Sequence, residues 1–76
     1  MSKISPIHWK DLVEFFESEG FVLNSVRGDH MVYTKEGCLR PVVIPKCKEI
    51  QVFIIVNNLN TANIKRDVFL KFLKRK

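Results

Sequence analysis

Hydrophobic residues near the start of the chain recur with the 3.6-residue period of an α-helix. One face of such a helix would hold Trp9, Leu12, Val13 and Phe16. Ser5-Pro6 is typical of a helix start, because serine accepts hydrogen bonds from free amides and proline suits the first helical position. Gly20 can end the helix in the left-handed conformation. The pattern therefore predicts a helix over about residues 6–19.

Three short segments rich in β-forming residues follow, and turn residues separate them. Gly28-Asp29 marks the first turn and residues 35–37 mark the second. The predicted strands are Phe21–Arg27, His30–Thr34 and Leu39–Ile44. They are close enough in sequence to form an antiparallel meander. Pro41 and Pro45 cannot donate hydrogen bonds to a neighbouring strand, so we expect the third strand at an edge of the sheet.

Residues 50–62 are rich in β-branched residues, which favour a strand, but they also show the period of a helix. The inward positions of that helix would be Val52, Ile55, Val56 and Leu59. We give the period more weight and predict a helix over residues 50–61. Asp67–Leu73 is predicted to form a short final helix, whose basic last turn complements the helix dipole. The expected order is α-β-β-β-α with a short extra C-terminal helix, an α+β fold with a three-stranded antiparallel sheet.

Length and composition indicate one domain over residues 1–76, because 46% hydrophobic content in 76 residues suffices for one compact core. No apolar run approaches the roughly 20 residues of a membrane span, and the first residues lack the apolar stretch of a signal peptide. Cys38 and Cys47 provide neither a disulfide framework nor a four-ligand zinc set. We therefore expect a cytoplasmic protein with free thiols and with no metal or other cofactor.

The charge is unevenly distributed along the chain. The net charge is +5, and residues 65–76 hold six Lys and Arg residues against one Asp, whereas residues 1–20 hold two against four acidic residues. A basic middle and a basic end suit a polyanion such as RNA or DNA. The tail would then contact phosphates through Lys74, Arg75 and Lys76. A solvated surface with a frayed, lysine-rich end explains the charge equally well.

Several short motifs occur along the chain in the order found in one protein family. They are Glu19-Gly20-Phe21, Gly28-Asp29-His30, Val43-Ile44-Pro45, the stretch Ile50–Ile64, and Lys65-Arg66-Asp67 with Phe69. Together they resemble the HicA-type mRNA interferase toxins of bacterial toxin–antitoxin systems, whose fold is similar to the double-stranded RNA-binding domain. The resemblance covers nearly the whole chain. Met31 stands where many members of the family have a second histidine.

The resemblance implies that His30 is the catalytic residue of a metal-independent ribonuclease, with mRNA as substrate and a HicB-type antitoxin as protein partner. The chemistry agrees, because an imidazole can take the proton of a 2′-hydroxyl or give one to a leaving 5′-oxygen. Cationic side chains that can steady the developing phosphate charge are Arg27, Lys46 and Lys48. Strand alternation groups His30 with Val32 and Thr34, away from Met31 and Tyr33, so we expect His30 to face solvent.

Simpler interpretations exist for the same residues. His30 can be a solvated histidine at the start of a strand, and the chain can be a non-catalytic RNA- or DNA-binding module on the same fold. A third possibility is a protein-interaction domain whose basic end docks on an acidic partner. We expect His8 to be a surface residue in the first turn of the first helix. We expect Trp9 to anchor the core rather than to stack on bases.

Overall fold

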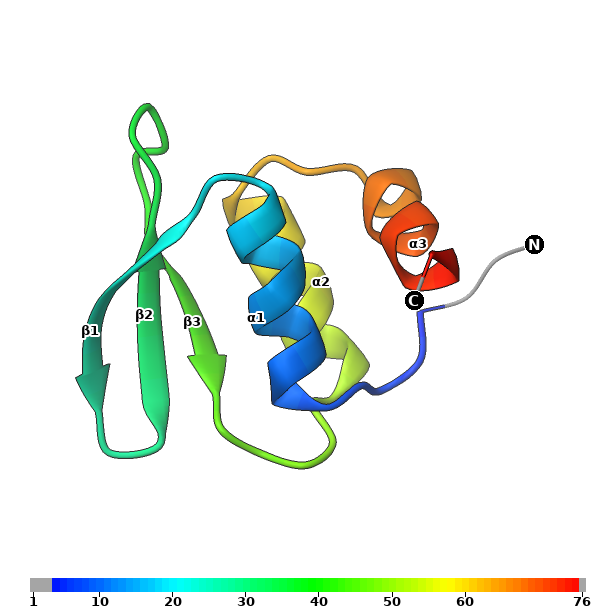
Figure 1. The fold of residues 1–76 in the computed structure, drawn as a ribbon, viewed down its shortest axis with the longest axis horizontal. Helices are drawn as coiled ribbons and strands as arrows, with labels where there is room; N and C mark the ends of the chain where they lie inside the picture. Colours follow the sequence, from blue (N-terminus) through cyan, green and yellow to red (C-terminus); the bar gives the residue numbers. More distant parts are fainter. Residues whose placement is uncertain (1–3, 76) are drawn as a thin grey trace.

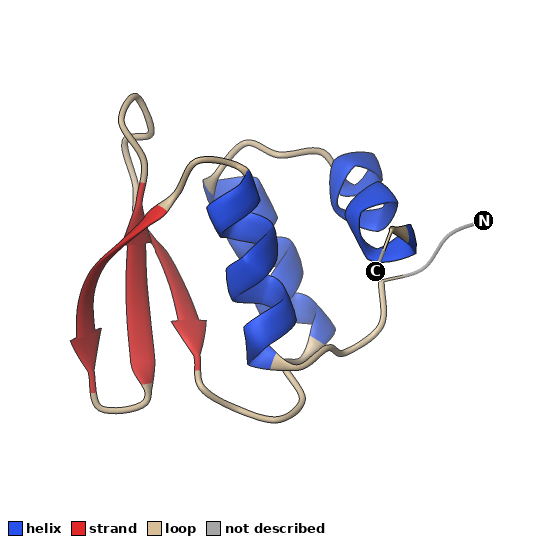
Figure 2. Ribbon diagram, in the orientation of Figure 1, coloured by secondary structure: helices blue, strands red, loops and turns tan. Residues whose placement is uncertain are grey.

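The computed structural model describes residues 4–75, and it has the predicted element order α-β-β-β-α-α (Figure 1). The elements are α1 (Trp9–Ser18), β1 (Val22–Arg27), β2 (His30–Thr34), β3 (Val42–Pro45), α2 (Val52–Thr61) and α3 (Arg66–Lys74). The α+β class and the three-stranded antiparallel sheet are therefore confirmed (Figure 2). Within residues 4–75, none of the helices combines the length and the apolar character needed to cross a membrane.

The sheet is an antiparallel meander in the order β1-β2-β3. A two-residue turn joins β1 to β2, and its Gly28 has a φ of 56°, in the left-handed region that glycine adopts without strain. On β2, Met31 and Tyr33 are buried and His30 is exposed, so the alternation predicted from the sequence is confirmed. β3 lies at an edge of the sheet, as its two prolines predicted.

The helices cover the sheet unevenly. Both α1 and α2 contact β3, whereas β1 lies on the side of the sheet farthest from the helices (Figure 1). No residue of β1 is buried, and its apolar Val22, Leu23 and Val26 are each at least half exposed. The turn between β1 and β2 lies at the end of the sheet, and Arg27 and His30 beside it are exposed.

The core lies between the sheet and the helices, and aromatic side chains attach α3 to it. Phe15 of α1 packs edge-to-face against Phe69 and Phe72 of α3, with ring centroids 5.0 and 5.3 Å apart. Phe16 packs similarly against Phe21, with centroids 5.2 Å apart. These contacts hold α3 against α1, on the far side of α1 from the sheet (Figure 1).

α1 begins later than its sequence pattern predicted. Ile7 and Ile50 form an antiparallel bridge in which the Ile50 N–H donates to the Ile7 carbonyl at 2.7 Å. This bridge keeps the chain extended until His8, whose Nδ1 accepts the N–H of Lys10 at 3.1 Å and caps the helix. The predicted helix start at Ser5-Pro6 is therefore wrong. The predicted end is correct, because Gly20 has a φ of 95°.

β3 is also displaced from its predicted position of Leu39–Ile44. The Cys38 N–H donates to the Lys35 carbonyl at 3.0 Å and closes a turn, and Leu39 beyond it is fully exposed. The strand begins only at Val42 and continues through Pro45. The prediction for residues 50–61 is confirmed, because α2 occupies nearly the whole of that stretch despite its β-branched residues.

Candidate nucleic-acid interface

Three segments that are distant in sequence meet at one end of the molecule, where β1 turns into β2, β3 leads into α2, and α1 begins (Figure 1). The Lys46 N–H donates to the Asp29 carbonyl at 2.6 Å, and the Trp9 N–H donates to the Cys47 carbonyl at 3.2 Å. We call this end the basic edge, and define it by Lys10, Arg27, His30, Lys46 and Lys48. These hydrogen bonds hold the three segments side by side at this end of the molecule.

His30 is the first residue of β2, and its side chain is exposed on the face of the sheet that points away from the helices. In the strand register it lies directly opposite Arg27 of β1 on one side and Pro45 of β3 on the other. Side chains of directly opposite residues share a face, with Cβ atoms about 4.5–5.5 Å apart. The sheet therefore brings a permanent cation next to the predicted catalytic histidine.

The two predicted lysine partners are arranged differently from Arg27. The Nζ atom of Lys46 lies 5.7 Å from the centre of the Trp9 ring, on the helical side of the sheet. Lys48 is exposed in the loop that leads to α2. Of the three cations predicted to help His30, the register thus assigns only Arg27 to the same face.

His8 is a helix cap and not a residue of the first helical turn, so that expectation is corrected. Because its Nδ1 accepts the Lys10 N–H, the proton of its neutral imidazole lies on Nε2. Its ring also lies against Trp9, with centroids 5.8 Å apart. His8 begins α1 on the helical side of the sheet, whereas His30 faces the opposite side, so the two histidines do not form a pair.

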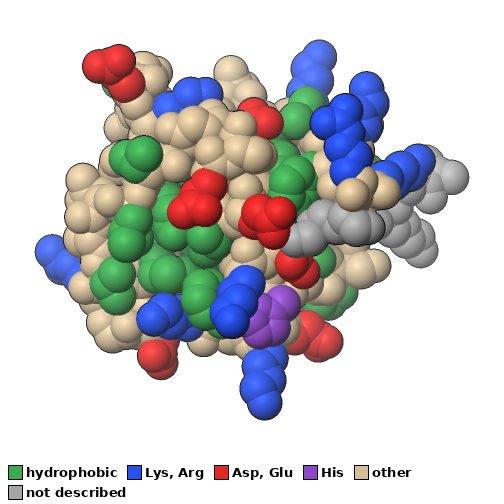
Figure 3. All heavy atoms as spheres, in the orientation of Figure 1, with side chains coloured by type: hydrophobic (Ala, Val, Ile, Leu, Met, Phe, Trp, Pro, Cys, Tyr) green, Lys and Arg blue, Asp and Glu red, His purple; other side chains and the backbone are tan. Residues whose placement is uncertain are grey.

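The predicted basic tail forms a second region, away from the basic edge. Lys74 is the last residue of α3 and Arg75 follows it, whereas Lys76 lies outside the described residues. Figure 3 shows some Lys and Arg side chains along the lower edge beside a histidine and others at the right, over α3, with further ones at the left edge and at the top. The structure therefore brings the segments that carry Arg27, His30, Lys46 and Lys48 to one end of the molecule, with only Arg27 on the face of His30, and it does not bring Lys74 and Arg75 to them.

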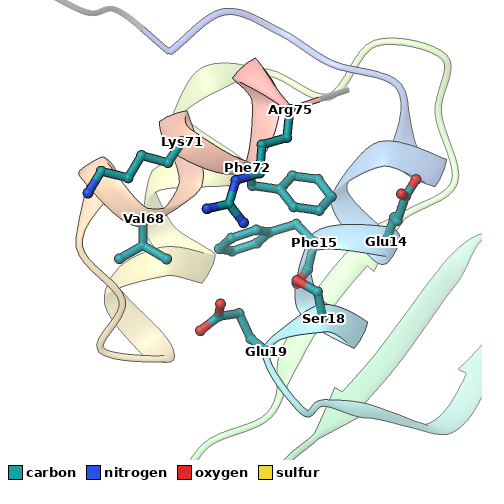
Figure 4. A pocket seen from close by; sticks show the side chains of 8 residues that line it. All are labelled: Glu14, Phe15, Ser18, Glu19, Val68, Lys71, Phe72 and Arg75. Carbon is teal, nitrogen blue, oxygen red and sulfur yellow. The ribbon is translucent and has the colours of Figure 1, made fainter.

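Arg75 contributes instead to a cleft between α1 and α3, of about 570 Å³. One acidic residue of α1, the acidic residue that follows α1, and basic residues at α3 line it around an aromatic floor (Figure 4). The lining residues are Glu14, Phe15, Ser18, Glu19, Val68, Lys71, Phe72 and Arg75. The Arg75 guanidinium points into this cleft (Figure 4), so its charge is directed to the α1 side rather than to the basic edge.

Trp9 packs on the core as predicted, and it also contacts two lysines that the sequence pattern did not place together. It packs against the core, as expected, but it is only half-buried, and Lys10 joins Lys46 over its ring with an Nζ-to-centroid distance of 5.7 Å. The Trp9-Lys10 pair was a visible signal in the sequence. The contact with Lys46 was not, because the two residues are 37 positions apart and only the folded chain joins them.

No protein-family model matches this chain, and no curated protein sequence does so either. Within residues 4–75, no three His, Cys, Asp or Glu side chains are grouped so that they could hold a metal ion. Cys38 and Cys47 are both free and half-buried.

Proposed function

We propose that this protein is a HicA-like toxin of a type II toxin–antitoxin system, a small cytoplasmic ribonuclease that cleaves mRNA through His30. The single observation that carries the proposal is the pairing of an exposed histidine with Arg27 across two strands, on an edge with further cations. The motif order and the α-β-β-β-α-α arrangement support it. A HicB-type antitoxin would be the protein partner that masks His30.

In the proposed reaction, His30 takes the proton from a 2′-hydroxyl, whose oxygen then attacks the adjacent phosphorus. The guanidinium of Arg27 is charged at every relevant pH and has several N–H donors, so it can stabilise the negative charge that develops on the phosphate oxygens. The protonated imidazole can then donate to the leaving 5′-oxygen. These steps use only side chains of the chain itself.

The alternative is a non-catalytic RNA- or DNA-binding module on the same fold. One observation favours it: Met31, which stands where many HicA-type toxins have a second histidine, is buried in the core. His30 is then the one imidazole on its face of the described sheet. A binding module would use Arg27, Lys46 and Lys48 as phosphate contacts and would need no acid–base group.

Cleavage of single-stranded RNA by the purified protein and by its His30→Ala variant tests the proposal. Because His30 is exposed, the variant should keep its free energy of unfolding within about 0.5 kcal/mol. Its cleavage rate should fall roughly 10²–10⁴-fold, since general acid–base help is lost, while RNA binding persists. The matched control is His8→Asn, because asparagine preserves the cap of α1. This control should cleave at the rate of the unchanged protein.

Each outcome decides between the candidates. Equal cleavage by the unchanged protein and the His30→Ala variant would refute the catalytic role of His30. Binding without any cleavage by the unchanged protein would favour the non-catalytic module. Unfolding of the variant would show that His30 is a structural residue.

A further inference from the structure

The Trp9 side chain lies at the basic edge with cationic side chains over its ring. The Nζ atoms of Lys10 and Lys46 are each 5.7 Å from the ring centre. The ring is half-buried, so part of it packs against the core and part reaches the surface. An aromatic surface flanked by cations is the arrangement with which proteins bind single-stranded nucleic acids.

We propose that Trp9 stacks on a base of single-stranded RNA while Lys10 and Lys46 contact the phosphates on either side of it. This inference rests on the RNA-binding part of the proposed function, and it holds whether or not His30 cleaves the strand. It assigns a base-binding role to a residue on the helical side of the sheet, away from the face that carries His30.

A backbone hydrogen bond holds the segments of this cluster together. The Trp9 N–H donates to the Cys47 carbonyl at 3.2 Å, which holds the start of α1 against the loop that carries Lys46. Since the ring and the lysine stems begin from neighbouring points of folded segments, only the two lysine side chains need ordering when RNA binds. On binding, the two lysine ammonium groups would move from the Trp9 ring to the RNA phosphates. The base would then stack on the part of the ring that the ammonium groups had covered.

The cluster is also connected to His30. The Lys46 N–H donates to the carbonyl of Asp29, and Asp29 directly precedes His30. A strand bound at Trp9 can therefore continue around the basic edge toward Arg27 and His30. Base stacking is tolerant of sequence because every base has a π-face, so this site would add affinity rather than strict specificity.

Trp9 is the one tryptophan of the chain, so intrinsic fluorescence reports on it directly. The experiment titrates the His30→Ala variant, which leaves RNA intact, with a short oligoadenylate. We expect the RNA to quench the fluorescence of Trp9 and to shield it from acrylamide. Trp9→Leu in the same background should raise the Kd, measured with labelled oligoadenylate, by roughly 5- to 150-fold. Circular dichroism of each variant confirms folding.

Two controls separate stacking from general effects. Phe53→Leu removes an aromatic ring of α2 that is 65% exposed, and should leave the Kd within about twofold. Trp9→Phe keeps a smaller ring and should lose only part of the affinity. If Trp9→Leu disturbs the fold, Trp9→Phe and the quenching measurement still test whether Trp9 stacks on a base.

Oligoadenylate that binds without changing Trp9 fluorescence or its shielding would overturn the stacking role, while the proposed function of His30 would stand. Absence of any RNA binding would overturn both proposals. Shielding by polyglutamate but not by RNA would assign the cluster to an acidic protein and overturn the inference. Quenching with a raised Kd in Trp9→Leu supports it, even if the unchanged protein does not cleave RNA.

Discussion

Asn58 is the one buried polar residue among residues 4–75, and it links α2 to the edge strand β3. Its side-chain Nδ2 donates to the Val43 carbonyl at 3.0 Å. Asn58→Ala removes the donor and leaves this acceptor without its partner. A lost partner of this kind costs about 1–3 kcal/mol when the remaining group is buried. Because this hydrogen bond is only partly buried, water can replace part of it, so we expect a loss of about 1–2 kcal/mol.

Asn60→Ala is the matched control, because it makes the same change on the same helix at an exposed position. Any gain in helix propensity from alanine is then common to both variants. Urea unfolding followed by circular dichroism should give a lower midpoint for Asn58→Ala than for Asn60→Ala, at similar slopes. In a domain of this size, a loss of 1–2 kcal/mol is a considerable share of the total stability. Equal midpoints for the two variants would show that the bond contributes nothing to the packing of α2 on β3.

Three further predictions concern charge. Burial, and secondarily the negative charge of Glu17, raise the pKa of Tyr33 above its ordinary value of 10.0. As pH rises, the unfolded chain therefore loses the phenol proton of Tyr33 before the folded chain does. The free energy of unfolding should fall as pH rises above 10.0, and it should fall less in Tyr33→Phe. An equal loss of stability at alkaline pH in both proteins would contradict this. Neutralising Arg27, Lys46 and Lys48 with Gln should reduce the salt slope of RNA binding by roughly 2. The same change at Lys74, Arg75 and Lys76 should also flatten the slope, and an unchanged slope would leave the tail as solvated surface.

The type and order of the elements could be predicted because each has a clear period. In α2 the helical spacing of Ile55 and Leu59 correctly predicted a helix, although β-branched residues favour a strand. Both residues are fully buried or nearly so. The same pattern missed Asn58, since a polar residue is ordinarily assigned to solvent. Its inward position depends on a carbonyl of β3, 15 residues earlier in the chain, and no local pattern contains that partner.

The predicted helix start was wrong at a place where segments distant in sequence meet. Ser5-Pro6 is a sound local signal for a helix start, but the bridge between Ile7 and Ile50 keeps the chain extended for three more residues. In the candidate site, too, local patterns were predictable and long-range contacts were not. Strand alternation predicted the exposure of His30, whereas the contact of Trp9 with Lys46 arises only when α1 docks on the loop after β3.

The separation of the two histidines limits what the proposed nuclease can do. His8 caps α1 on the helical side, so it cannot act as acid while His30 acts as base on the other face. Arg27 stabilises charge but does not exchange protons near neutral pH. One imidazole must therefore accept the 2′-hydroxyl proton first and donate it to the 5′-oxygen afterwards, and these two transfers cannot be simultaneous. A non-catalytic module with the same edge would bind RNA equally well. Affinity therefore cannot separate the two functions, and the comparison of cleavage rates between the unchanged protein and His30→Ala can.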